Sequence, residues 1–235
     1  YIFHGPNHDY GVEGLSLFEA ADPSMSVAVN EAGPDLTNLR QGSSAGEWGI
    51  TWSLVEDYTF QVFVPGNKSE SVFVGDGWGQ RDHKNTDVGA TLPYVIRRIE
   101  GDGHSAAFVT AFAGCQADQT LVKSVRMLPL PDNVPAGTVA VAVDTSQGTD
   151  IVLSVLAPTP VTVSTDLGKL CTDGRLAVVR SSGNGPTSIM QVGGTKLTLG
   201  DNEVTSPEGV LSGRVLGYGS PPGSSWFDLD AAVDT

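Results

Sequence analysis

Hydrophobic and polar residues alternate in two neighbouring segments, residues 48–54 and 58–64. Successive side chains of a β-strand point to opposite faces, so this alternation is typical of strands with one buried face. The acidic pair Glu56-Asp57 lies between the two segments and predicts a tight hairpin turn. Residues 48–64 are therefore expected to form two antiparallel strands.

Short apolar runs with strand character recur from Gly137 onward, and clusters of Gly, Asp and Asn separate them. The strands predicted in this part cover residues 139–143, 151–156, 161–164, 175–180, 189–192, 196–199 and 210–216. Many short strands with regular turn signals are typical of an all-β sandwich, and no helical period extends over ten residues. We predict an all-β fold, an antiparallel β-sandwich of many short strands with few or no helices.

The remaining segments give a weaker pattern. Strands are expected at 93–100, 105–113 and 120–130, and residues 15–40 are expected to be a loop with one short strand at 24–29. The length of 235 residues suffices for one large β-domain or two small ones. We expect one large sandwich over residues 1–219, with room for a sub-boundary near 131–137, and a terminal strap or linker over 220–235.

A glycine-rich stretch, residues 72–98, begins and ends with strand character. The loop predicted between its strands holds Gly75, Gly77, Gly79 and Gly89, which permit backbone angles that other residues resist. The same loop concentrates an aromatic residue, both charge signs and a histidine: Trp78, Gln80, Arg81, Asp82, His83, Lys84 and Asp87. Functional residues collect on loops held by rigid scaffolds, so this loop is the first candidate for a site. An ordinary surface loop whose Trp78 covers the core edge explains it equally well.

The N-terminal residues contain a second cluster, His4, His8, Asp9 and Tyr10. A His–Tyr pair can supply a general base and a general acid, which makes His8 and Tyr10 the candidate catalytic residues. His4, His8 and Asp9 could instead bind a divalent metal, although no cofactor is required by the sequence. Hydrogen bonding at a strand end accounts for the same residues, and it is the interpretation we favour for the isolated chain.

Strand parity sorts the aromatic and basic residues at 94–98. Tyr94 and Arg98 share one face of an unbulged strand, whereas Arg97 faces the other side. A Tyr beside an Arg is common in sugar-binding sites, and it is also common in plain sheet packing. The candidate substrate-binding residues are Trp78, Arg81, His83, Tyr94 and Arg98.

The net charge of −14 excludes some classes of binding partner and disfavours others. It repels nucleic-acid phosphates and anionic lipid at long range, so we expect no nucleic acid as a partner. It disfavours a polyanionic sugar more weakly, because salt screens charges beyond about 10 Å and a local basic group can prevail at contact distance. No apolar run reaches about 18 residues, so no membrane span is predicted.

Cys115 and Cys171 are compatible with one disulfide or with two free thiols, and neither has a metal-type spacing. The sequence opens at Tyr1 with strand character and without a signal peptide. We expect a processed chain or an excised part of a longer protein that is secreted or periplasmic.

Three groups of short motifs occur in order along the chain. They are Gly5-Pro-Asn-His-Asp-Tyr10; Gly75-Asp-Gly-Trp-Gly-Gln-Arg81 followed by Leu92-Pro-Tyr-Val-Ile-Arg97; and Asp150-Ile-Val-Leu-Ser154, Asp173-Gly-Arg-Leu-Ala-Val-Val-Arg180 and Val192-Gly-Gly-Thr-Lys-Leu197. Together they resemble the C-terminal β-sandwich of heparinase II/III-type polysaccharide lyases.

The resemblance implies β-elimination of uronic-acid polysaccharides, in which a base removes the proton next to the carboxylate and an acid protonates the leaving oxygen. In that family a helical toroid supplies much of the machinery, and a strand with a His-Gly-His-Xaa-Asp pattern adds to it. Neither is found in this sequence. The expected function is therefore the sandwich portion of such a lyase, inactive without an N-terminal helical domain.

Two alternatives remain open. A small stand-alone lyase would use His4 or His8 as base, Tyr10 or Tyr94 as acid, and Arg81 or Arg98 to neutralise the carboxylate, because an Arg fork matches a carboxylate at two points. A carbohydrate-binding or structural extracellular β-domain would instead stack Trp78, Tyr94 and Trp48 on sugar rings. An acidic polysaccharide or another glycan is the expected partner in all but the structural version.

Overall fold

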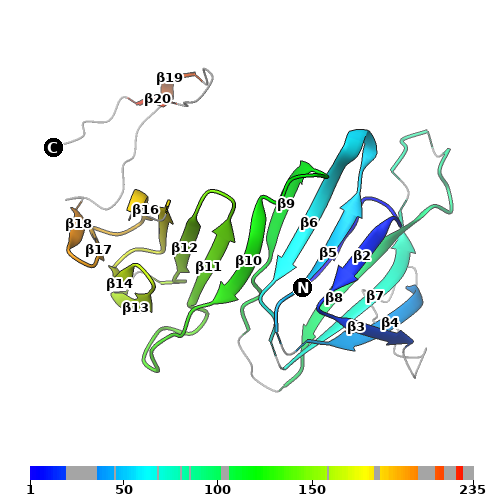
Figure 1. Cartoon of the computed structure of the whole chain (residues 1–235), viewed down its shortest axis with the longest axis horizontal. Coiled ribbons are helices and arrows are strands. Elements are labelled where there is room, and N and C mark those ends of the chain that lie inside the picture. The colour runs from blue at the N-terminus through cyan, green and yellow to red at the C-terminus, as the bar shows by residue number, and fades with distance from the viewer. Residues whose placement is uncertain are drawn as a thin grey trace. The chain divides into compact units, whose positions relative to one another are not determined.

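The chain is all-β. A computed structural model describes residues 1–19, 36–44, 46–67, 69–79, 81–84, 86–101, 106–157, 159–182, 186–205, 215–219 and 226–229. These residues form twenty strands and one three-residue 3-10 helix, and they contain no α-helix (Figure 1). Every strand pair whose register is defined is antiparallel. The predicted fold class, an antiparallel β-sandwich of many short strands, is confirmed.

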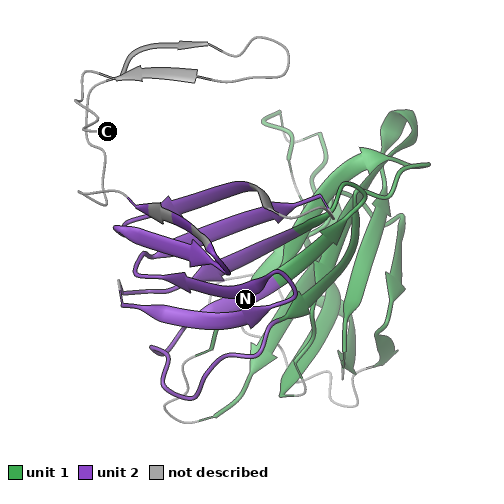
Figure 2. Ribbon diagram, turned by 60° about the vertical axis from the view of Figure 1, so that its left-hand side comes forward, with its two compact units in different colours: residues 1–127, 142–149 green, residues 128–141, 150–235 purple. Residues whose placement is uncertain are grey.

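Two compact units divide the chain (Figure 2). Unit 1 comprises residues 1–127 and 142–149, and unit 2 comprises residues 128–141 and 150–235. Most of the expected terminal strap, residues 220–235, lies outside the described residues. Within it, β20 (Trp226–Leu229) pairs with β19 (Val215–Gly219). The expected organisation, one sandwich with room for a sub-boundary near 131–137, stays a prediction.

Unit 1 is built on two antiparallel sheets. Sheet A has the order β1 (Ile2–His4), β8 (Thr91–Ile99), β7 (Glu70–Trp78), β4 (Thr37–Ser43) and β3 (Ser16–Glu19). Sheet B has the order β2 (Tyr10–Glu13), β5 (Trp48–Ser53), β6 (Tyr58–Val64) and β9 (Ala111–Gln116). The strand β10 (Val122–Met127) follows, and the backbone N–H of Val125 donates to Glu47 Oε1 at 2.9 Å.

The core of unit 1 lies between these two sheets. Its buried residues come from β5 and β6 of sheet B and from β7 and β8 of sheet A: Trp48, Ile50, Trp52, Val62, Val64, Val72, Val74 and Val95. The alternation in residues 48–54 and 58–64 thus marks the face that is removed from water, which is the main stabilising contribution to such a fold. Trp48 is only 2% exposed, so its predicted role as a sugar-stacking residue is wrong.

The β5–β6 hairpin confirms the turn predicted at Glu56-Asp57. The short 3-10 helix covers Val55–Asp57, and the backbone N–H of Tyr58 donates to the carbonyl oxygen of Val55. Glu56 and Asp57 have φ angles of 60° and 59°. Two successive positive φ angles match the right-handed twist of the flanking strands in a two-residue hairpin, at the cost of strain in residues other than Gly or Asn.

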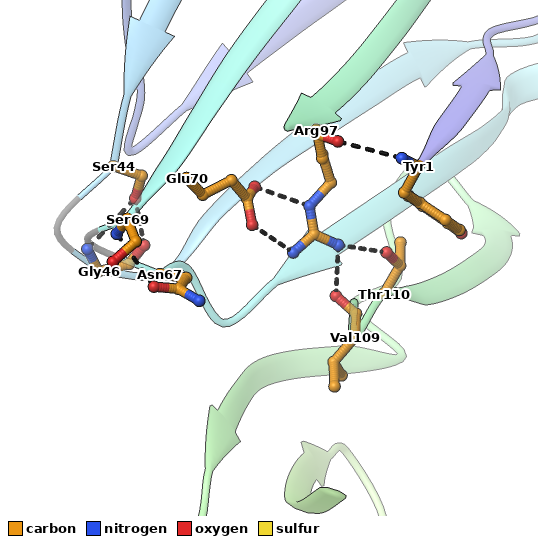
Figure 3. A network of polar contacts seen from close by, with 9 residues as sticks. All are labelled: Tyr1, Ser44, Gly46, Asn67, Ser69, Glu70, Arg97, Val109 and Thr110. Atoms are coloured by element: carbon orange, nitrogen blue, oxygen red, sulfur yellow. Dashed lines mark hydrogen bonds and ion pairs between the residues drawn. The ribbon is translucent and has the colours of Figure 1, made fainter. Parts of the chain in front are cut away.

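A buried ion pair lies at one end of this core (Figure 3). Arg97 Nε donates to Glu70 Oε1 at 2.7 Å, and Arg97 Nη2 donates to Glu70 Oε2 at 2.8 Å. Arg97 Nη1 also donates to the carbonyl oxygen of Val109 and to Thr110 Oγ1, each at 2.7 Å. All donor nitrogens of the guanidinium therefore have an acceptor, as a buried charge requires.

The structure corrects several expectations for unit 1. The segment 15–40 contains β3 and the start of β4, whereas the strand expected at 24–29 lies outside the described residues. Gly75 and Gly77 are part of β7 rather than of the loop. Residues 106–110 are not a strand, and β9 begins at Ala111, later than expected.

Unit 2 combines two further sets of strands. One set contains, in sheet order, β11 (Val139–Thr145), β12 (Thr149–Ser154), β15 (Leu176–Ser181) and β16 (Pro186–Val192). Residues 142–149, which include most of β11 and the first residue of β12, are assigned to unit 1. The other set has the order β13 (Val161–Thr165), β14 (Gly168–Thr172), β17 (Lys196–Leu199) and β18 (Asn202–Thr205). The strands predicted from the sequence correspond to β11, β12, β13, β15, β16 and β17, whereas β14 and β18 were missed. The strand predicted at 210–216 lies outside the described residues except for its last two positions, which belong to β19.

Candidate functional site

The loop of residues 5–9 closes one end of the unit 1 sandwich. It joins β1 in sheet A to β2 in sheet B. At its start the backbone N–H of Gly5 donates to the carbonyl oxygen of Pro93 at 2.8 Å, and at its end Asp9 accepts from the backbone N–H of Ser53 at 3.0 Å. Because both ends are hydrogen-bonded to strands, the loop places the predicted His8 over the ends of β7 and β8.

His8 is engaged through both ring nitrogens. Its Nε2 lies 2.9 Å from the carbonyl oxygen of Thr91 and 3.1 Å from Thr91 Oγ1. Its Nδ1 lies 3.5 Å from Asp76 Oδ1, and Asn38 Nδ2 donates to the other Asp76 oxygen at 2.6 Å. A carboxylate beside an imidazole orients the ring, which is the arrangement of many general bases. The Nε2 atom, however, already faces Thr91, so it has no free direction toward a substrate.

Trp78 is the exposed aromatic residue of this end. It is the last residue of β7, and 58% of its surface is exposed. The Tyr94 hydroxyl donates to the carbonyl oxygen of Trp78 at 2.9 Å. The Tyr94 ring lies over Gly77, where an added Cβ would be 2.7 Å from it, and its centroid is 5.5 Å from that of His4. His4 and Tyr94 thus share one face of sheet A, whereas the side chain of Trp78 belongs to the other face and only its backbone oxygen meets Tyr94.

Hydrogen bonds to two aspartates stabilise the hairpin loop that follows Trp78. Asp87 accepts from the backbone N–H groups of Arg81 and Asp82, at 2.7 and 3.1 Å. Asp82 accepts from the Thr86 hydroxyl and from the backbone N–H of Lys84. The Thr86 hydroxyl lowers the pKa of Asp82, and the backbone N–H of Arg81 lowers the pKa of Asp87, because both bonds favour the charged carboxylate. Gln80 lies outside the described residues.

The three predicted basic residues of the site have different partners. Arg81 Nη1 donates to the carbonyl oxygen of Pro6 at 3.0 Å, so Arg81 ties the hairpin loop to the 5–9 loop. His83 lies 3.5 Å from Asp82 and is 86% exposed. Arg98 shares the Tyr94 face of β8, as parity requires, but it forms an ion pair with Glu100 at 3.0 Å. Arg81 is therefore the basic residue that the structure ties directly to the loop carrying His8.

Tyr10 is partly buried against the core rather than fully open to solvent. It packs against the core cluster, and its ring centroid is 5.9 Å from that of Trp52. The Arg40 guanidinium donates to its hydroxyl and lies 5.9 Å from the ring centroid. The bond from Arg40 leaves the phenolic proton free, so it is the packing of Tyr10 against the core, and not this contact, that does not favour Tyr10 as a general acid.

A metal site at His4, His8 and Asp9 finds no support in the geometry. Within the described ranges, no group of three or more His, Cys, Asp or Glu side chains is arranged to hold a metal ion. His4 Nδ1 lies 3.2 Å from the carbonyl oxygen of Gly5, and His8 faces Thr91 and Asp76. A divalent metal at these residues stays a prediction.

The sequence analysis missed Asp76, Thr91 and Asn38. They come from three strands of sheet A, and only the strand order β8-β7-β4 brings them together. Asp76 could have been noticed, because it lies inside the glycine-rich motif of residues 75–81. Strand pairing sets it opposite Pro93, in the second part of the same motif. Without knowing that β4 existed, the partner Asn38 could not be found.

The two cysteines are free thiols, Cys115 buried and Cys171 half-buried. The described part of the chain holds no helix that is long and apolar enough to cross a membrane. No protein-family model, no curated protein and no solved structure matches this chain.

Proposed function

We propose that unit 1 is a glycan-binding β-sandwich module and that Trp78 is its stacking platform. The observation that carries this proposal is the exposure of Trp78, 58%, on a backbone that several contacts hold in place. Aromatic rings supply a large contact area at low conformational cost, and a tryptophan that covers no core is a surface available to a ligand.

The backbone around Trp78 is fixed on both sides. Tyr94 holds its carbonyl oxygen, and the backbone N–H of Gly79 donates to Ala90 at 2.9 Å. A Cβ at position 79 would lie 2.7 Å from Leu92 Cγ, so the hairpin passes too close to β8 for any residue but glycine. Rigid positioning before binding reduces the entropy lost when a ligand is bound, and this favours a binding role.

The polar groups beside Trp78 suit a hydroxylated or carboxylated ligand. Arg81 uses one guanidinium nitrogen for Pro6, and a guanidinium carries five N–H donors in all. Asp76 and the His8 ring add an acceptor and a titratable group. Because Asp82 and Asp87 are close to Arg81 in the loop, an acidic polysaccharide should bind more weakly at low salt than a neutral glycan of the same size.

The proposal is tested by titrating the protein with oligosaccharides of hyaluronan, alginate and cellulose while tryptophan fluorescence is recorded. We expect at least one of them to bind and Trp78→Ala to weaken that binding roughly tenfold or more. Trp78→Phe should retain part of the affinity. Val55→Ala is the matched control, because Val55 is 82% exposed and removed in sequence from this site. Binding that survives Trp78→Ala unchanged, or no binding to any of the three, would contradict the proposal.

A second candidate function is the sandwich portion of a heparinase II/III-like lyase, and the His8–Asp76 contact favours it. The carboxylate orients the imidazole, but Nε2 is turned to Thr91, so His8 would abstract a proton beside a uronate carboxylate only after that contact is broken. The resemblance that suggests this function also assigns essential residues to a helical domain, so the chain alone should be inactive. Incubation with uronate polysaccharides should therefore give no absorbance of unsaturated uronate. A rise that is lost in His8→Ala would show instead that the chain is a complete lyase.

A further inference from the structure

Unit 1 contains a hollow that none of the predicted site residues line. It has a volume of about 560 Å³ and lies where Tyr58, at the start of β6, faces the edge strand β9. The turns after β9 and after β11 contribute Gln119 and Gln147. All of its lining residues belong to unit 1.

The lining combines polar and apolar groups and carries no charged side chain, although the chain has a net charge of −14. Three carboxamides, those of Gln116, Gln119 and Gln147, and the Ser146 hydroxyl line it. Each carboxamide offers both donors and an acceptor, which is the pairing that a sugar hydroxyl requires. A charged ligand finds no counter-charge in this lining, so the chemistry selects an uncharged one.

An aromatic ring completes the lining. Tyr58 is 45% exposed and lies directly opposite Gln116 in the β6–β9 pairing. Among the described residues, no group makes a hydrogen bond to the Tyr58 hydroxyl or to the Gln147 carboxamide. An exposed ring with unpaired polar groups beside it can stack on the apolar face of a pyranose and bond to its hydroxyls.

Hydrogen bonds within the turns hold the polar groups in place. The backbone N–H of Gln119 donates to the carbonyl oxygen of Gln116 at 2.9 Å, and Gln119 Nε2 donates to Gln116 Oε1 at 2.9 Å. The backbone N–H of Ser146 donates to the carbonyl oxygen of Leu121 at 3.0 Å, which joins the two turns. The carboxamides of Gln116 and Gln119 are therefore arranged before a ligand arrives.

Gly114 keeps the hollow open. It lies on β9 within the lining, and an added Cβ there would meet no atom within 4 Å. A side chain at position 114 would therefore extend into open space and leave the strand undisturbed. Glycine weakens a strand, so its presence at a position with room for a side chain agrees with a need for access to the backbone.

We propose that this hollow binds an uncharged, hydroxyl-rich sugar, with Tyr58 as the stacking ring and the three glutamines as hydrogen-bonding partners. The inference does not rest on the site at Trp78, because the two sites share no residue. It assigns this chain a neutral-sugar site in addition to the end that carries His8 and Trp78.

The test uses cellohexaose, xylohexaose, mannohexaose and maltohexaose as probes, with calorimetry and saturation-transfer NMR as readouts. At least one should bind the whole chain, and Tyr58→Ala and Gly114→Val should each weaken that binding roughly tenfold or more. Gly11→Val is the matched control, because position 11 is also in a strand of sheet B with no atom within 4 Å of an added Cβ. It should leave the dissociation constant within about twofold.

Two outcomes would overturn the inference. The first is that none of the four neutral hexasaccharides binds. The second is that one binds but Gly114→Val leaves its affinity unchanged while its folding is intact by circular dichroism. If Trp78→Ala abolishes that binding instead, the sugar belongs to the end of the sandwich and the proposal for the hollow fails alone. If Gly114→Val abolishes binding and Trp78→Ala does not, the hollow is established, and the role of Trp78 is decided by its own titrations.

Discussion

The guanidinium of Arg97 and the carboxylate of Glu70 form a two-point ion pair, at 2.7 and 2.8 Å, in which each residue is only 3% exposed. Glu70 and Arg97 lie at the start of β7 and near the end of β8, on the sheet face that carries Val72 and Val95. Removing two charges from water is costly, and the four hydrogen bonds of the guanidinium, two of them to the carboxylate, offset that cost.

Breaking this pair from one side should be severe. Glu70→Gln leaves the guanidinium buried without a counter-charge, and we expect a loss of about 3–5 kcal/mol in the free energy of unfolding. Urea unfolding followed by tryptophan fluorescence measures it, because Trp48 and Trp52 lie in the same core. An exposed pair gives the matched control: Glu100→Gln removes the partner of Arg98 and should cost less than about 1 kcal/mol.

Replacing both charges tests the explanation further. In Glu70→Met combined with Arg97→Met, no charge is buried, so the double variant should be more stable than Glu70→Gln alone. It should remain below the wild type, since the carbonyl oxygen of Val109 and Thr110 Oγ1 lose their donor. A double variant less stable than Glu70→Gln would mean that packing volume, not charge, governs this position.

Strands with strong alternation could be predicted from the sequence, and strands of mixed polarity could not. The segments at β5, β6 and β17 were located because each exposes one face and buries the other. The segment of β4, Thr37–Ser43, contains Asn38, Arg40, Gln41 and Gly42 and has no such signal. Arg40 points inward from β4, and its guanidinium donates a hydrogen bond to the hydroxyl of Tyr10 in the other sheet. Such a long-range partner is invisible in a local pattern.

The candidate site was located only in part by sequence reasoning. Parity along β8 correctly separated Arg97 from Arg98, and the unshifted β7–β8 register is the reason. Which of the two is buried could not be known, because it depends on which face of sheet A packs against sheet B. The sequence also could not show that the cluster at 4–10 is split between two environments. Tyr10 packs against the core, whereas His8 lies in the 5–9 loop and contacts Thr91.

The 5–9 loop should depend on the absence of a side chain at Gly5. An added Cβ would lie 2.1 Å from Trp52 Nε1 and 2.3 Å from Trp52 Cε2, and Trp52 is fully buried. We expect Gly5→Ala to cost about 2–3 kcal/mol through overpacking and to shift the loop that carries His8. Thermal unfolding and the ring proton shifts of His8 are the measurements.

Gly11→Ala is the control for this effect, because an added Cβ at position 11 meets no atom within 4 Å. It should change the free energy of unfolding by less than about 0.5 kcal/mol. If Gly5→Ala were equally neutral, the close approach of Trp52 to the loop would not exist in solution.

The hairpin turn at Glu56-Asp57 should be open to stabilisation. Both residues have positive φ angles, 60° and 59°, which Asn and Gly adopt at lower cost than acidic residues. We expect Glu56→Asn combined with Asp57→Gly to stabilise the protein by about 1 kcal/mol and to raise its melting temperature by about 2–4 °C. Glu56→Gln with Asp57→Thr removes the same two charges but keeps side chains that resist a positive φ, so it controls for the loss of charge. A melting temperature that falls in both variants would contradict the strain assigned to this turn.

Asp173 should make unit 2 sensitive to acid. Its carboxylate accepts from the Thr195 hydroxyl at 2.5 Å, from the backbone N–H of Lys196 at 2.9 Å and from Gln191 Nε2 at 2.9 Å. These bonds, the Thr195 hydroxyl first, lower the pKa of Asp173 to about 2. An unfolded aspartate has a pKa of about 3.9. The depressed value therefore stabilises the fold above about pH 4, and this contribution is lost as the pH falls toward 2.

An asparagine at position 173 does not ionise, so Asp173→Asn separates the contribution of the Asp173 carboxylate to stability from that of the other acids. We expect the variant to be less stable than the wild type near neutral pH by about 1 kcal/mol, a value reduced by solvent screening at this partly exposed group. The difference between the two proteins should then shrink between about pH 4 and pH 2, because the wild-type carboxylate becomes protonated there. Urea unfolding across this range measures both curves. A difference that stays constant down to about pH 2 would show that the Thr195 and Lys196 bonds do not favour the charged form.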